Sequence, residues 1–247
     1  MWRLSTYLIL GGIFAAASAL IYFIHYLIFE DVHHIFIYMV GDLAFLPLEV
    51  FLVVLVIERV LARREKKAVH EKLNMVTGAF LSEVGNNLLL DLLNCFPKKD
   101  ELRRQLAIKP DWTHADFRRA MDFAGSLELD PDCADIDLEE LKALLVEKRQ
   151  FLVNLLESPN VLEHDRFTDL LWATFHLTEE LEARESLVNL PSEDMKHISG
   201  DIRRLYKHLL VEWVMHVEHL QSSYPHLFSL VARTHPFQES PSAVVTE

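Results

Sequence analysis

Two long apolar stretches open the chain, separated by a short polar segment. They cover residues 4–29 and 35–57, and each is longer than the roughly 20 helical residues that span a hydrocarbon core. The first stretch contains no Asp, Glu, Lys or Arg. This pattern predicts a transmembrane helical hairpin over residues 1–61.

Beyond the hairpin, apolar residues recur every three or four positions, which is the period of an amphipathic helix. The run from Leu73 to Leu92 contains no proline, so one helix is predicted to continue from the second apolar stretch. Thr113, followed by Asp116, predicts a capped helix start. Prolines divide the rest of the chain into predicted helices over residues 113–125, 137–157, 164–186 and 192–222, with a short one through Phe228 and Val231.

No stretch alternates between apolar and polar residues over the length of a strand. The predicted fold class is therefore all-α, with a two-span transmembrane helical hairpin followed by a cytosolic helical-bundle domain over residues 62–237. Residues 238–247 are polar and lack a periodic pattern, so they are predicted to form a flexible tail.

Basic residues lie on one side of the hairpin. Arg3 precedes the first stretch and a basic run follows the second, whereas the connecting turn has no Lys or Arg. Short loops rich in Lys and Arg stay on the cytoplasmic side of a membrane. We therefore expect a multi-pass protein of the cell inner membrane with both termini in the cytoplasm. The basic run consists of Arg59, Arg63, Arg64, Lys66 and Lys67.

A cleaved signal peptide is the alternative interpretation of the first stretch. Ala17, Ser18 and Ala19 fit the small-residue pattern that precedes a cleavage site. However, the apolar run continues for ten residues beyond Ala19, and a single Arg precedes it. A membrane span is therefore the favoured interpretation.

The negative charge is concentrated in the cytosolic part. Residues 1–67 hold six basic and six acidic side chains, so the whole formal charge of −13 falls on residues 68–247. Proteins that follow a phosphate backbone need concentrated positive charge. Nucleic acid is therefore excluded as an expected partner, and lipid contact is expected at the hairpin and the basic run that follows it.

The cytosolic part carries no catalytic signature. Its four glycines are scattered singly, which excludes a P-loop, a dinucleotide-binding turn and a nucleophile elbow. Cys95 and Cys133 are far apart and lack the spacing of metal ligands, which suits packing in a reducing compartment. We therefore expect a protein that is not an enzyme and that has no cofactor, apart from the metal ion considered below.

Two acids interrupt the second apolar stretch. Asp42 and Glu49 are seven residues apart, so they share one face of a helix and are separated by about 10 Å along its axis. An ionised acid in the hydrocarbon core costs about 2.5–3.5 kcal/mol, so such residues face a protein interior or water. Two interpretations stay open. The acids line an ion or proton pathway, or they bond across a helix interface and lock an oligomer.

Small residues in the first stretch predict self-association. Gly11, Gly12, Ala15 and Ala16 form two pairs spaced four residues apart, which allows close approach of another helix. Two helices cannot enclose an aqueous path by themselves. Either interpretation of the acids therefore implies a homo-oligomer.

A stripe of histidines and acids follows one face of the predicted helix over residues 192–222. Side chains one turn apart on a helix can converge on one metal ion, so the stripe predicts a metal-binding or proton-binding cluster. The stripe also borders an apolar face, where such residues are common without a metal, and the motifs of di-iron bundles and zinc proteases are missing. Its residues are His197, Asp201, His208, Glu212, His216 and His219, with His176 and Glu180 facing them from the preceding helix.

These patterns lead to three hypotheses about function. The leading one is a self-associating, non-enzymatic membrane anchor that presents an acidic helical domain for binding a cytosolic protein partner or relaying a signal. The second is an oligomeric ion channel or proton pathway lined by Asp42 and Glu49. The third is a metal-binding enzyme that uses the stripe of histidines and acids.

Overall fold

The computed structural model describes residues 2–127, 131, 133, 136–158, 161 and 164–244. Among these residues every regular element is helical and no strand occurs, which confirms the predicted all-helical class. The chain divides into two compact units, Met1–Lys66 and Lys67–Glu247.

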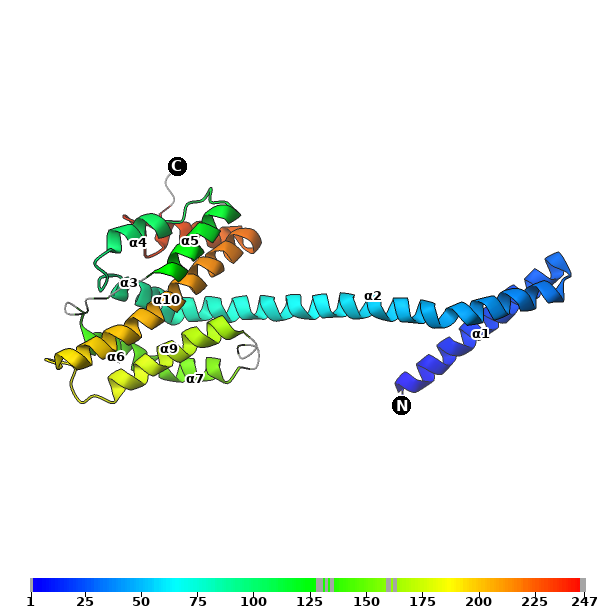
Figure 1. Ribbon diagram of the computed structural model, residues 1–247, viewed down its shortest axis with the longest axis horizontal. Coiled ribbons are helices and arrows are strands. Elements are labelled where there is room, and N and C mark those ends of the chain that lie inside the picture. The colour runs from blue at the N-terminus through cyan, green and yellow to red at the C-terminus, as the bar shows by residue number, and fades with distance from the viewer. Residues whose placement is uncertain are drawn as a thin grey trace. The chain divides into compact units, whose positions relative to one another are not determined.

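The first unit holds α1 (Trp2–Phe29) and the N-terminal part of α2 (Val32–Phe80), joined by a short turn (Figure 1). Glu30 takes a positive φ of 48° in this turn, and its backbone N–H donates to a carbonyl oxygen of the preceding turn at 2.8 Å. The rings of His25 and His34 stack with their centroids 5.9 Å apart. This contact joins the two helix ends beside the turn.

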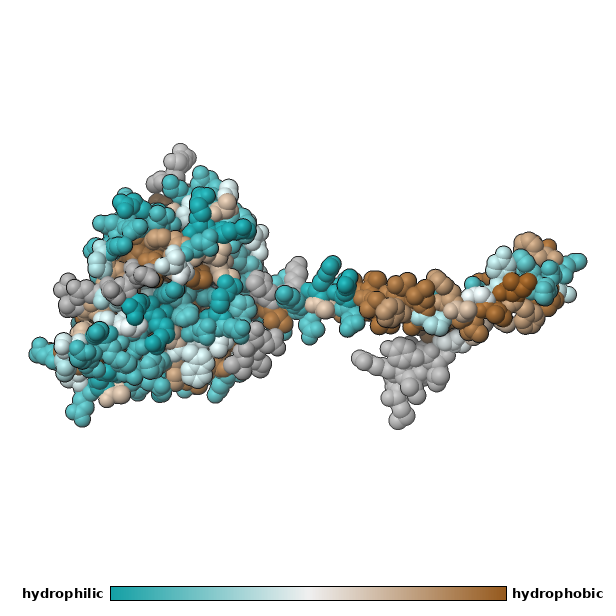
Figure 2. All heavy atoms as spheres, in the orientation of Figure 1, coloured by the Kyte–Doolittle hydropathy of each residue, from teal (hydrophilic) through white to brown (hydrophobic). Residues whose placement is uncertain are grey.

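The two helices of the first unit are long and apolar enough to cross a membrane, judged by length and composition. Figure 2 shows hydrophobic side chains over the visible face of α2 in its apolar part. Phe51, Leu52, Val53 and Val54 are all more than half exposed, and four consecutive residues point to all sides of a helix. A helix that is apolar on every side is typical of a membrane span or of a buried core helix, and no other part of the unit covers this one.

The second unit is a bundle of helices around α10 (Ser192–Ser223). α10 contacts α3, α5, α9 and α11, and its buried face carries Leu205, Tyr206 and Trp213. These side chains belong to one continuous apolar core. The other elements after α2 are η1 (Leu81–Gly85), α3 (Asn86–Leu93), α4 (Lys99–Leu106), α5 (His114–Ser126), α6 (Leu138–Glu147), α7 (Arg149–Leu156), α9 (Asp165–Glu182) and α11 (Pro225–Thr234).

Buried residues at the end of α2 and in η1 and α3 follow a repeat of four residues. Buried pairs begin at Phe80, Val84, Leu88 and Leu92, and on a straight α-helix each step of four would rotate about 40° from the one before. The π-helical turn η1 lies within this run, and its wider i→i+5 winding offsets the rotation. The buried pairs therefore keep facing the same core.

The start of α5 confirms the predicted cap. The backbone N–H of Thr113 donates to Asp116 Oδ2 at 2.7 Å, and the Thr113 hydroxyl contacts the same oxygen at 2.6 Å. These bonds supply partners for groups that a helix start leaves unpaired.

The predicted helix over residues 137–157 forms two helices, α6 and α7, so the prediction of one unbroken helix is wrong. Lys148 leaves the helical region, with φ −88° and ψ 1°. Its backbone N–H still bonds to Leu144 and its carbonyl oxygen to Leu152, so the apolar pattern continues across the break. The periodicity alone therefore gives no sign of the irregularity.

The described part of the predicted tail contacts α11. The backbone N–H of Ser242 donates to the carbonyl oxygen of Arg233 at 3.1 Å, and Arg233 Nη1 donates to the carbonyl oxygen of Ala243 at 2.6 Å. Residues 245–247 lie outside the described residues.

Buried imidazoles make the second unit sensitive to acid. His235 is 3% exposed, its Nε2 lies 3.3 Å from the carbonyl oxygen of Ile108, and its Nδ1 accepts the backbone N–H of Phe237 at 3.2 Å. Burial lowers the pKa of His235 from 6.5 to about 4, and burial also lowers the pKa of His216 to about 4. The unfolded chain therefore binds more protons than the folded chain below pH 6.5, and stability falls as the pH drops toward 4.

We expect His235→Gln to reduce this acid sensitivity. Between pH 7 and pH 5, the free energy of unfolding of the parent protein should fall by roughly 2 kcal/mol more than that of the variant. Urea unfolding followed by tryptophan fluorescence at both pH values measures the difference. His226→Gln, which alters an exposed histidine of α11, is the control. The same pH dependence in the parent and in His235→Gln would contradict the assignment.

Candidate metal centre

Four polar side chains meet where α9 packs against α10. His176 and Glu180 lie one turn apart on α9, and His197 and Asp201 lie one turn apart on α10. Residues four apart share one face of a helix, and the packing of the two helices turns these faces toward each other. The sequence analysis expected His176 and Glu180 to face the whole stripe, and in the structure they lie beside His197 and Asp201.

The ligand atoms of these residues have a regular spacing. The Nε2 atoms of His176 and His197 each lie 3.5 Å from Asp201 Oδ2. His197 Nε2 lies 3.5 Å from Glu180 Oε2, and His176 Nε2 lies 3.8 Å from Glu180 Oε1. These separations are longer than the 2.7–3.2 Å of an N–H···O hydrogen bond. His176, Glu180 and His197 each offer one ligand atom, and these three atoms lie within 4.8 Å of one another.

Asp201 forms the floor of the cluster. Its side chain is 3% exposed, and Oδ1 accepts a hydrogen bond from Arg204 Nη1 at 3.0 Å. Oδ2 is buried and has no hydrogen-bond partner, although it faces both imidazoles. An unpaired buried carboxylate oxygen costs free energy, which an ion bound at this position would recover.

An arginine holds the second carboxylate in place. Arg184 Nη1 donates to Glu180 Oε2 at 2.9 Å, while its Nε and Nη2 donate to the two carboxylate oxygens of Asp194 at 3.0 and 2.6 Å. The Arg184 hydrogen bond is the main reason that the pKa of Glu180 lies below its usual value. Glu180 is therefore kept as a carboxylate, the form that binds a cation, and Asp194 offsets part of the arginine charge.

The cluster opens toward solvent. The side chains of His176 and His197 are 43% and 54% exposed, whereas Asp201 is buried beneath them. Imidazole nitrogens together with carboxylate oxygens are ligands that suit Zn²⁺ among the common divalent ions. An ion could enter from the solvent side and bind against the Asp201 floor.

The rest of the predicted stripe lies elsewhere along α10. Glu212 is eleven residues beyond Asp201, which corresponds to about 16 Å along a helix, so one ion cannot contact both. Glu212, His216 and His219 line a separate cavity. His208 is partly buried between the two groups, and burial lowers its pKa. The eight predicted residues therefore belong to more than one place in the fold.

The candidate residues of the first unit are exposed. Asp42 and Glu49 lie on the surface of α2, and no ion pair joins them to any described residue. Nothing lies within 4 Å of a Cβ built on Gly11 or Gly12. Ala15 and Ala16 are exposed next to these glycines, so this helix face is uncovered within one chain.

Sequence reasoning missed the arginines of the centre. Arg184 lies just beyond the end of α9, and Arg204 is three residues after Asp201. The spacing of Arg204 from Asp201 was a readable signal, since residues three apart are helix neighbours. The Arg184 contact to Asp194 crosses the loop between the helices and has no such signal.

Comparison with known proteins places both units in one family. The model of the N-terminal helical domain of MJ1433 matches residues 2–61, and the model of the C-terminal helical domain of Uncharacterized protein MJ1433 matches residues 69–233. The chain belongs to the MJ1433 family. Uncharacterized protein MJ1433 of Methanocaldococcus jannaschii is 42% identical over 230 residues, which cover 93% of this chain and 92% of that protein. No solved structure matches the chain.

The metal-centre residues of this MJ1433 family member all lie in the range that matches the C-terminal helical domain. Asp42 and Glu49 lie in the range that matches the N-terminal helical domain. The two family models therefore divide the candidate residues as the two compact units do.

Replacing the arginine beside the centre tests its role in holding the carboxylates. Arg184 lowers the pKa of Glu180 and of Asp194, whose ordinary values are 4.5 and 3.8. Carboxylates of lowered pKa stabilise the fold above those values, and this contribution is lost as the pH falls through them. We expect Arg184→Gln to lower the thermal unfolding midpoint at pH 7, with the gap to the parent closing below about pH 4.

Thermal unfolding, followed by circular dichroism at pH 7 and again below pH 4, measures this difference in midpoint. Lys196→Gln, which alters an exposed cation of α10, is the control and should leave the midpoint at pH 7 nearly unchanged. If the unfolding midpoints of the parent and of Arg184→Gln differed as much below pH 4 as at pH 7, the ion pairs of Arg184 would not be the cause of the difference.

Proposed function

We propose that this MJ1433 family member is a membrane-anchored protein whose helical domain binds Zn²⁺ or a similar divalent metal ion. The observation that carries the proposal is the Oδ2 atom of Asp201, which is buried, has no hydrogen-bond partner and lies 3.5 Å from two imidazole nitrogens. His176, His197, Asp201 and Glu180 would bind the ion.

The proposed centre ties two helices together and does not perform catalysis. Four protein ligands complete the tetrahedral coordination of Zn²⁺, which is typical of structural sites, whereas catalytic sites keep one position for water or substrate. The ion would link α9 to α10, and folding of the domain would then be coupled to metal binding. This role agrees with a sequence that lacks catalytic motifs.

The proposed anchor is the hairpin of residues 1–61. Its support is the length and apolar surface of both helices and the basic run after the second one. In this proposal both termini are cytoplasmic, and small residues around Gly11 and Ala15 mediate self-association within the bilayer. The acidic helical domain then faces the cytoplasm, where its metal-bound form binds a protein partner or relays a signal.

Substitution of Asp201 tests metal binding. Asp201→Asn keeps the shape of the side chain and can retain a bond to Arg204, but it removes the negative charge. The parent, purified without a histidine tag, should bind about one Zn²⁺ per chain and unfold at a higher temperature when Zn²⁺ is added. The variant should bind Zn²⁺ at least about tenfold more weakly. Without metal, the variant should be about as stable as the parent, because loss of the ion pair with the exposed Arg204 is offset by burying a neutral amide in place of a charge.

Isothermal titration and thermal unfolding, with and without a chelator, make these measurements. Asp169→Asn, which alters an exposed acid of α9, is the matched control and should bind Zn²⁺ as the parent does. Less than about a tenth of an equivalent of metal in the parent after Zn²⁺ is supplied, or equal affinity in Asp201→Asn, would refute the centre.

Membrane fractionation tests the anchor. We expect the full chain to stay in the membrane pellet after carbonate washing, since two apolar spans are held by the bilayer itself. A reporter fused to the C-terminus should be active only on the cytoplasmic side. Release of the chain by carbonate, or a reporter that is active outside, would contradict the proposed topology.

A further inference from the structure

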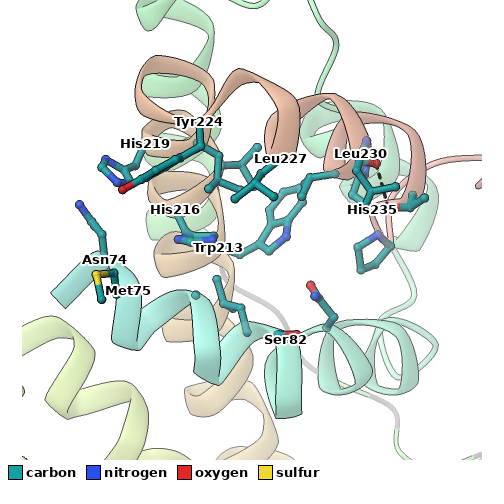
Figure 3. A pocket seen from close by; sticks show the side chains of 18 of the residues that line it. Asn74, Met75, Ser82, Trp213, His216, His219, Tyr224, Leu227, Leu230 and His235 are labelled. Carbon is teal, nitrogen blue, oxygen red and sulfur yellow. Dashed lines mark hydrogen bonds between the residues drawn. The ribbon is translucent and has the colours of Figure 1, made fainter. Parts of the chain in front are cut away.

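Two adjoining cavities lie along the C-terminal half of α10. The larger has a volume of about 680 Å³ and lies between the end of α2, η1 and α3 on one side and α10 and α11 on the other (Figure 3). The smaller has a volume of about 450 Å³ and is lined by residues of α2, α5 and α10, together with His164. Asn74, His216 and His219 line both cavities, so the two spaces meet at these side chains.

The larger cavity has an apolar lining that is open to solvent. Trp213 lies at its base, and Figure 3 shows Leu227 and Leu230 of α11 on the opposite side from Ser82. Leu227 and Leu230 are 44% and 46% exposed, and Met75 is 68% exposed. Scattered exposed apolar residues are ordinary, but several that line one concave space indicate a binding site for an apolar group.

The smaller cavity contains buried polar atoms without hydrogen-bond partners. These atoms are Asn74 Nδ2, Glu212 Oε1 and His216 Nδ1. Glu212 is 4% exposed, and Arg166 Nε lies 3.9 Å from its Oε1, which is too long for a hydrogen bond. Unpaired buried polar atoms that gather in one cavity indicate a polar ligand group.

The charges of the smaller cavity favour a cation. Burial lowers the pKa of His216 to about 4, so this imidazole is neutral at pH 7. Glu218 contacts His114 at the edge of the cavity, which leaves Glu212 as the buried acid inside it, with only the exposed Arg166 3.9 Å away as a charged partner. Burial raises the pKa of Glu212, and a bound cation would favour its charged form.

We propose that the two cavities form one binding site for a single-chain amphiphile with an amine headgroup. The alkyl chain lies in the apolar cavity between Trp213 and Leu227, and the ammonium group reaches Glu212 past Asn74 and His216. This site is separate from the metal centre, and its occupation does not depend on Zn²⁺. The apolar lining matches the alkyl chain, and the buried acceptors Glu212 Oε1 and His216 Nδ1, which have no hydrogen-bond partner, match the ammonium group.

Photoaffinity labelling tests the proposal on the full chain in lipid nanodiscs. The probe is an alkylamine with a diazirine at the far end of its chain, and the comparison probe is the alcohol of equal length. Labelled peptides are identified by mass spectrometry, and labelling of α1 and the apolar part of α2 reports how much probe is in the bilayer. Relative to that reference, the amine should label α11 about tenfold more than the alcohol, as a charge-assisted hydrogen bond predicts.

A matched pair of substitutions distinguishes binding in the cavity from nonspecific labelling of the protein surface. Asn86 lines the apolar cavity, whereas the neighbouring Asn87 does not, and both are exposed on α3. Asn86→Trp should fill the cavity and reduce labelling of α11 several-fold, and Asn87→Trp should leave it unchanged. Equal labelling of α11 in these two variants, or labelling confined to the spans, would overturn the site.

The headgroup assignment has its own test. Glu212→Gln should remove the preference for the amine over the alcohol and retain labelling of α11 by both probes. Glu193→Gln, which alters an exposed acid at the start of α10, should keep the preference. If Glu212→Gln kept the preference, or if the parent had none, the assignment of an amine headgroup would be wrong.

Discussion

Burial of one face of α10 is the constraint on which the second unit depends. The helix contacts α3, α5, α9 and α11, and the apolar side chains on the face that packs against them are almost fully buried, among them Ile198, Leu205 and Val217. Burying a large apolar side chain contributes about 1.5–3 kcal/mol, which is comparable to the cost of leaving one polar group unpaired. A helix with this many buried apolar residues can therefore also hold Asp201 and Glu212 in unfavourable surroundings. Both polar sites exist because the apolar face of the same helix fixes them.

The two sites differ because their neighbours differ. Asp201 faces two half-exposed imidazoles, and these imidazoles also lie beside Glu180, so several ligand atoms gather in one place. Glu212 is on the same helix, but its surroundings are a neutral imidazole, an amide and a distant arginine. A single acid beside an apolar cavity suits the headgroup of an organic cation better than a metal ion, which needs more ligands. Two carboxylate side chains, Asp201 and Glu212, are thus suited to different ligands at two positions of one helix.

Much of the fold follows from local sequence signals. The helix over residues 192–222 has a proline before its start, acids in its first turn and a long apolar period, and the structure places α10 there. The helix α4 was not predicted, because only Leu102 and Leu106 mark its buried face. The break at Lys148 was not predicted either, because the backbone bonds on both sides of it preserve the apolar period.

The candidate sites could be predicted only in part. Spacing along two helices predicted eight candidate metal ligands, among them the four that meet between α9 and α10, since residues four apart share one helix face. The eleven-residue separation of Asp201 and Glu212 already corresponds to about 16 Å along a helix, so the spacing was a readable sign that one ion cannot bind the whole stripe. The larger cavity combines residues from α2, η1, α3, α10 and α11, and no local pattern brings these segments together.

The π-helical turn η1 has a consequence for how this family can tolerate changes in length. Each residue of an α-helix turns it by about 100°, but the wider winding of η1 accommodates one extra residue in a single turn. If one residue were deleted from Leu81–Gly85 and ordinary α-helical winding returned, the two changes would offset each other and Leu88 and Leu92 would still face the core. A residue deleted elsewhere in this run has no such compensation and would turn the buried pairs that follow it away from the core.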